Sequence, residues 1–225
     1  MLKPYLILWA GAVFGMAVAA SPAWSDTYPG PAGLEWGMPE SKAQKVLSQR
    51  FNYQEKYGVK FAQAVEYEYA GTFAGFDESR VVATMYRGEF VGLTVQLPVP
   101  VVRPATRVWM EAVDKMRGKY GDPDQRSATP DTMKDHLAKR GVEVPSDKAG
   151  LLDLKIRSGE WKPKALWRFD NEVVVAIVAR LGEKGPDDYA RPLKVFWSFA
   201  KLPAMRAMHQ EVEANKEESD IPEDF

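Results

Sequence analysis

Between residues 104 and 120, apolar residues recur in steps of three and four, which is the spacing of one helical face. This stripe consists of Trp109, Ala112, Val113, Met116 and Tyr120. Pro104 suits the first turn of a helix, where its missing N–H costs nothing, and Gly121 and Pro123 are typical of a helix end. The spacing predicts a helix over 104–120, with β-rich chain on both sides of it.

Six other stretches either alternate polar and apolar residues or run apolar and β-branched, and both patterns predict strands. The predicted strands cover 61–69, 80–86, 90–97, 165–169, 172–181 and 193–199. Further helices are expected at 39–51, at 131–139 and from 203 onward. Short turns between successive strands favour antiparallel sheets with helices on one face. The sequence thus predicts an α+β fold, as one six-stranded sheet or two three-stranded sheets. The order of elements is consistent with a duplicated α-β-β-β unit.

These elements are expected to form a single domain followed by an acidic tail. The domain covers 26–209, with half-units at about 34–100 and 103–200 and an insert at 124–164. Residues 27–33 hold two prolines and two glycines and are expected to be a linker. Residues 210–225 carry seven acidic residues and one lysine, which is typical of a solvated C-terminal tail.

Residues 1–25 have the pattern of a secretory signal peptide. Lys3 precedes an apolar run over 5–20, and small residues mark candidate cleavage sites at 18–20 and 23–25. The alternative is an uncleaved membrane anchor, but the apolar run is shorter than the ~20 residues that span a bilayer. We therefore expect a periplasmic or secreted protein with no transmembrane span once the signal is removed.

The chain of 225 residues contains no cysteine. Disulfides, a thiol nucleophile, cysteine metal ligands and a lipid-anchoring cysteine are therefore excluded. Residues 26–209 carry 28 basic and 24 acidic residues, a mild positive excess. Nucleic-acid-binding proteins usually carry a concentrated basic face, so no nucleic-acid partner is expected. Charge does not indicate the oligomeric state.

Catalytic and cofactor motifs are absent from the sequence: there is no nucleophile elbow, phosphate-binding loop, dinucleotide fingerprint or zinc-protease motif. The histidines are His136 and His209, and neither has a partner at metal-ligand spacing. Met205 and Met208 beside His209 could bind Cu(I), but methionines at helical spacing more often face a core. We expect no metal, no cofactor and no catalytic residue.

Glu66 and Glu68 lie on one face of a predicted strand and could act as paired carboxylates in glycoside hydrolysis. The alternation with Phe61, Val65 and Tyr67 explains both glutamates as an exposed face opposite an apolar one. This second interpretation is favoured.

Aromatic residues gather late in the chain, and three of them are candidates for a ligand or partner surface: Trp161, Phe196 and Trp197. Phe196 falls on the opposite strand face from Trp197. Core packing is the default for such residues, and exposure would indicate a binding surface.

The turn Trp36-Gly37-Met38-Pro39, which leads into a predicted helix and then a three-stranded meander, resembles small secreted bacterial proteins of unknown function. Over about 34–97 it is loosely similar to the outer-membrane-assembly lipoproteins of the SmpA/OmlA type. The chain departs from that pattern, since it lacks the lipid-anchor cysteine and a Leu-Gly-x-Pro after the first helix. The resemblance implies binding within the cell envelope and transfers no functional residue.

The expected function is therefore a non-enzymatic binding protein that contacts an envelope protein through a sheet edge or an aromatic groove. The alternative is a carrier that holds a small apolar ligand between the sheet and the helices. The third hypothesis is a hydrolase that uses carboxylates alone.

Overall fold

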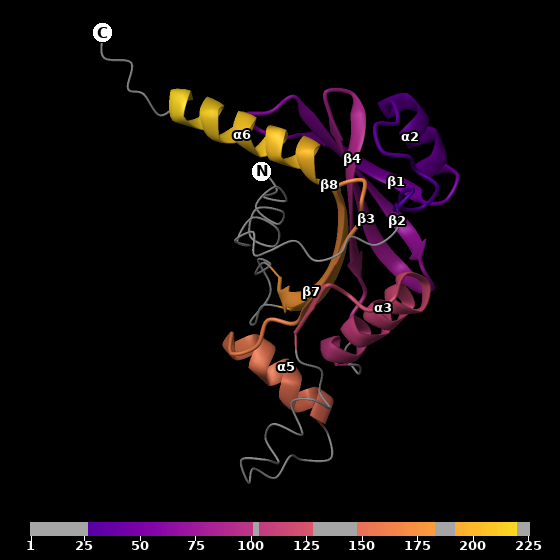
Figure 1. Ribbon diagram of the computed structural model, residues 1–225, viewed down its shortest axis with the longest axis vertical. Coiled ribbons are helices and arrows are strands. Elements are labelled where there is room, and N and C mark those ends of the chain that lie inside the picture. Colours follow the sequence, from indigo (N-terminus) through magenta and orange to yellow (C-terminus); the bar gives the residue numbers. More distant parts are fainter. Residues whose placement is uncertain (1–26, 101–103, 128–147, 183–191, 220–225) are drawn as a thin grey trace.

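The fold is an α+β arrangement built on one antiparallel sheet. The computed structural model describes residues 27–100, 104–127, 148–182 and 192–219 (Figure 1). The helices in these ranges are α2 (Glu40–Ser48), α3 (Ala105–Tyr120), α5 (Lys148–Ser158) and α6 (Leu202–Ser219). The strands are β1 (Asn52–Gly58), β2 (Ala64–Phe73), β3 (Phe76–Tyr86), β4 (Glu89–Leu97), β5 (Gln125–Arg126), β6 (Lys164–Arg168), β7 (Val173–Leu181) and β8 (Leu193–Lys201).

The strands form a single sheet in the order β1-β2-β3-β4-β8-β7-β6-β5. Each half of the chain has a helix followed by four antiparallel strands, with α5 inserted between β5 and β6 in the second half, and the halves join where β4 pairs with β8. The alternative of two separate sheets is therefore wrong, and each repeat-like unit holds four strands where three were predicted. The sequence missed β1 because its residues, Asn52–Gly58, are almost all exposed and carry no apolar alternation.

The main core lies between the sheet and the helices α2, α3 and α5. Trp109, Ala112, Val113 and Met116 of α3 are buried there, which confirms the predicted stripe. Burying one large apolar side chain contributes about 1.5–3 kcal/mol, so this face accounts for the position of α3.

The N-terminus of α3 is held by a side chain from α5. Asp153 accepts hydrogen bonds from the backbone N–H groups of Ala105 at 2.7 Å and Thr106 at 2.9 Å, and from the Thr106 hydroxyl at 2.6 Å. The first turn of a helix leaves such N–H groups without intrahelical partners, and its dipole favours an anion. The predicted insert thereby contributes a cap to the central helix.

Residues 27–33 were expected to be a linker, but they pack on the core. Tyr28 is 5% exposed, and its ring lies 5.0 Å from that of Phe169 and 5.7 Å from that of Phe199. The Tyr28 carbonyl accepts hydrogen bonds from Trp36 Nε1 and Asn171 Nδ2. The prolines and glycines of this segment directly follow the buried Tyr28, where the chain turns.

The last helix, α6, lies on the opposite face of the sheet from the main core (Figure 1). It continues to Ser219, so the first part of the predicted acidic tail is helical. The predicted signal peptide (1–25), the predicted helix 131–139 and residues 220–225 lie outside the described residues. Within the described ranges, no helix has the length and apolar character needed to cross a membrane.

Candidate functional site

The face of the sheet opposite the main core, which we call the second face, carries a row of polar side chains across four strands. This polar band consists of Glu66, Glu68, Arg80, Thr84, Thr94, Gln96 and Ser198. The strand register places Glu66 opposite Thr84, and Thr94 opposite Ser198. Arg80 lies opposite Gln96, which connects β3 to β4, and side chains two apart on a strand share a face, so the band is continuous across the four strands.

Glu66 is the only acidic or basic side chain that is buried within the described part of the chain, at 3% exposure. The Thr84 hydroxyl donates a hydrogen bond to Glu66 Oε1 at 3.3 Å. Burial disfavours the charged carboxylate and raises the pKa of Glu66 to about 7, although Thr84 and the nearby Arg80 act in the opposite direction. Glu66 therefore exchanges a proton near neutral pH. The expectation that Glu66 belongs to an exposed face is wrong, because the second face is not a solvated surface at this position.

Glu68, two residues along β2, is in a different electrostatic environment. Arg80 Nε donates to Glu68 Oε1 at 2.5 Å, and a second guanidinium nitrogen donates to Oε2. Such bidentate pairs fix the geometry of both groups, so both oxygens of Glu68 are engaged by Arg80. The two candidate glutamates thus differ in their burial and in their hydrogen-bond partners.

The rest of the polar band extends toward the centre of the sheet. Thr94 Oγ1 and Ser198 Oγ lie 3.5 Å apart, and Lys194 Nζ donates to Gln96 Oε1 at 3.3 Å. Beyond the band, the Arg180 guanidinium carbon lies 4.8 Å from the centre of the Phe196 ring. The second face therefore combines carboxylates, hydroxyls, an amide and cations. Such groups can form hydrogen bonds and ion pairs with a polar partner.

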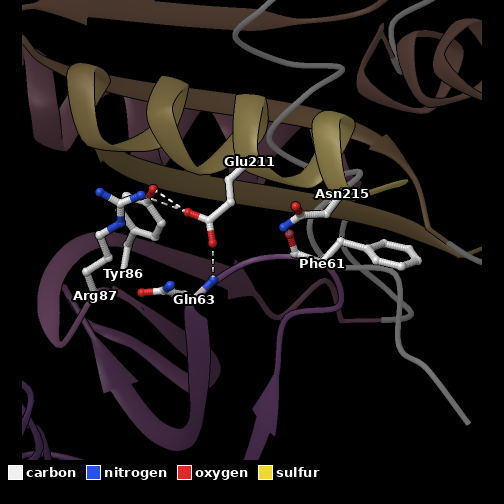
Figure 2. A network of polar contacts seen from close by, with 6 residues as sticks. All are labelled: Phe61, Gln63, Tyr86, Arg87, Glu211 and Asn215. Atoms are coloured by element: carbon white, nitrogen blue, oxygen red, sulfur yellow. Dashed lines mark hydrogen bonds and ion pairs between the residues drawn. The ribbon is translucent and has the colours of Figure 1, made fainter. Parts of the chain in front are cut away.

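At one end of the second face, α6 is fastened by a polar network (Figure 2). Glu211 accepts hydrogen bonds from the Gln63 backbone N–H at 2.6 Å, the Tyr86 hydroxyl at 2.7 Å and an Arg87 guanidinium nitrogen at 3.1 Å. These donors, Tyr86 foremost, lower the pKa of the Glu211 carboxyl. One helical turn further on, Asn215 donates to the Phe61 carbonyl at 2.8 Å.

The three aromatic candidates do not form a common surface. Trp197 is 4% exposed in the main core, where its ring lies 5.3 Å from that of Phe73. Trp161 is partly buried on the same side, against Trp109. Phe196 is 8% exposed and lies on the second face, because adjacent strand residues point to opposite sides.

Met205 and Met208 are both buried against the sheet, so the prediction that they are core-facing is confirmed. In the described ranges, no group of three or more His, Asp or Glu side chains is placed to hold a metal ion. His136 lies outside those ranges.

Most members of the polar band were not predicted from the sequence as site residues, although the alternation of polar and apolar residues marks some of them. Thr94, Gln96 and Ser198 alternate with apolar residues along β4 and β8, whereas Arg80 and Thr84 lie in a largely apolar part of β3. The alternation could not show that these residues meet on one face, since that depends on strand order and register.

Comparisons of the chain with protein-family models, with curated proteins and with solved structures found no match.

Proposed function

We propose that this chain is an exported, non-enzymatic binding protein of the cell envelope, and that its partner engages the second face of the sheet. The observation that carries the proposal is the polar band, with the buried carboxyl of Glu66 within it. The export pattern of residues 1–25 supports the location, and the resemblance noted for 34–97 supports a binding role.

A buried carboxyl is costly, and this cost is the reason to assign it a role. An apolar residue at position 66 would continue the side-chain packing without desolvating a charged group. Polar groups kept at such a cost are often found at functional positions, where local rules of stability are broken. The half-buried members of the band, Thr94, Gln96 and Ser198, offer both hydrogen-bond acceptors and donors to a polar partner.

The hydrolase alternative has one feature in its favour. Burial raises the pKa of Glu66, which lies beside a second glutamate in a different environment, and acid–base enzymes also place their two carboxylates in unlike environments. Against it, both oxygens of Glu68 are engaged by Arg80, and the Glu66 side chain is shielded. A nucleophile or base needs a free oxygen facing the substrate, so a binding role is the better-supported proposal.

The apolar-ligand carrier finds less support, since aromatic rings meet in the layer where its pocket would lie. Phe73, Trp197 and Phe199 pack with ring centres 5.3–5.9 Å apart. Rings at this separation are in direct contact.

Site-specific photo-crosslinking in the exporting cell tests the proposal. A photoreactive side chain at Gln96, within the band, should yield one adduct of defined mass with a partner, and Glu66→Gln should reduce its yield. The matched control is the same side chain at Lys45, which is exposed on α2. Equal adducts from both positions, or none from Gln96, would count against the second face as the binding site.

A further inference from the structure

The helix α6 is attached to the domain through an apolar cluster that is separate from the main core. This cluster, which we call the α6 cluster, comprises Ala64, Tyr86, Val91, Ala200, Met205 and Met208. Met205 packs closely over Gly92, where a Cβ atom would lie 3.5 Å from the methionine sulfur. Elements held by few buried apolar contacts open at a lower free energy than the core that they cover.

Beyond this cluster, the C-terminal half of α6 is held by polar contacts to two turns (Figure 2). Glu211 contacts Gln63 in the β1–β2 loop and Arg87 in the β3–β4 turn. Asn215 adds a second contact to the first of these loops, at Phe61. We call the contacts of Glu211 and Asn215 the latch. The latch connects three segments that are far apart in sequence.

Both turns contain a residue with left-handed backbone geometry at a contact of the latch. Phe61, whose carbonyl accepts from Asn215, has φ of 67°. Arg87, whose side chain pairs with Glu211, has φ of 52°. A non-glycine residue in this region costs free energy, and it persists when surrounding contacts hold it there. The latch supplies one of the contacts around each of these two residues.

From these features we infer that α6 is a movable strap, which opens as a unit while the sheet stays folded and which the latch holds closed. Opening uncovers Ala64, Tyr86 and Val91 at the end of the second face, next to Glu66 on β2. The strap thereby controls access to that end of the face. This last consequence rests on the proposed function, whereas the opening itself does not.

Hydrogen exchange followed by mass spectrometry on the full chain tests the strap. Backbone amides of α6 should exchange through an opening that leaves the amides of β3 and β4 protected. Glu211→Gln keeps the shape of the side chain and removes its charge, so it weakens all three hydrogen bonds. It should speed exchange in α6 by on the order of tenfold, with no change in β3 and β4.

The matched control is Glu213→Gln, which removes the same charge from an exposed position of the same helix. It should leave exchange in α6 unchanged. The inference is overturned if α6 exchanges as slowly as the central strands in the unmodified chain. It is also overturned if Glu211→Gln speeds both regions equally, or if Glu213→Gln has the same effect as Glu211→Gln.

Discussion

The substitution Glu66→Gln should stabilise the protein at alkaline pH, and the gain should vanish in acid. Glutamine has nearly the same shape as protonated glutamate, and its amide can donate to the Thr84 hydroxyl in the place where the carboxylate accepted. The variant therefore keeps the packing and removes the ionisation.

The magnitude follows from the difference in pKa between the two states. Burial raises the pKa of Glu66 from 4.5 to about 7 in the folded protein. The folded state therefore binds a proton more tightly than the unfolded state does. The contribution of Glu66 to the free energy of unfolding is greatest below about pH 4.5, falls as pH rises to about 7 and is level above that. A shift of about 2.5 units corresponds to about 3 kcal/mol, so Glu66→Gln should be more stable than the unmodified 225-residue chain by up to that amount at pH 8.

Urea unfolding at pH 4, 6 and 8, followed by tryptophan fluorescence, measures this difference. The matched control is Glu68→Gln on the same strand and face, which loses the pair with Arg80 and should be destabilised at pH 8. The reasoning is refuted if Glu66→Gln is less stable than the unmodified chain at pH 8, or if the gain is the same at all three pH values.

Three further outcomes are expected. Asp153→Ala removes the acceptor at the start of α3 and should cost about 1–3 kcal/mol in urea unfolding, since it leaves the N–H groups of that turn without their partner. Arg80→Ala should raise the pKa of Glu66 further, because Arg80 favours the charged form; a carboxyl NMR titration measures the direction. Expression in an exporting bacterial host should yield a mature chain that begins at Asp26, read by intact-mass spectrometry, and an unprocessed N-terminus would contradict the export proposal.

Much of the local structure could be predicted from periodicity alone. The buried stripe of α3 follows from the spacing between Trp109 and Met116, and the opposite orientations of Phe196 and Trp197 follow from strand alternation. In each case the spacing of apolar residues within the element shows which of its sides is buried, and no knowledge of distant segments is needed. The sequence therefore determined the types of most elements, though not of β1, β5 or α5, together with the α+β class and the assignment of Met205 and Met208 to an apolar contact.

Only the tertiary structure decided which elements contact one another. Thr94 and Ser198 are 104 positions apart in the chain and become neighbours because β4 pairs with β8 at the centre of the sheet. Alternation identified Glu66 as facing away from the main core but could not reveal its burial, which raises its pKa. Periodicity reports the polarity of a face, whereas burial and electrostatics depend on segments brought to that face from elsewhere in the chain.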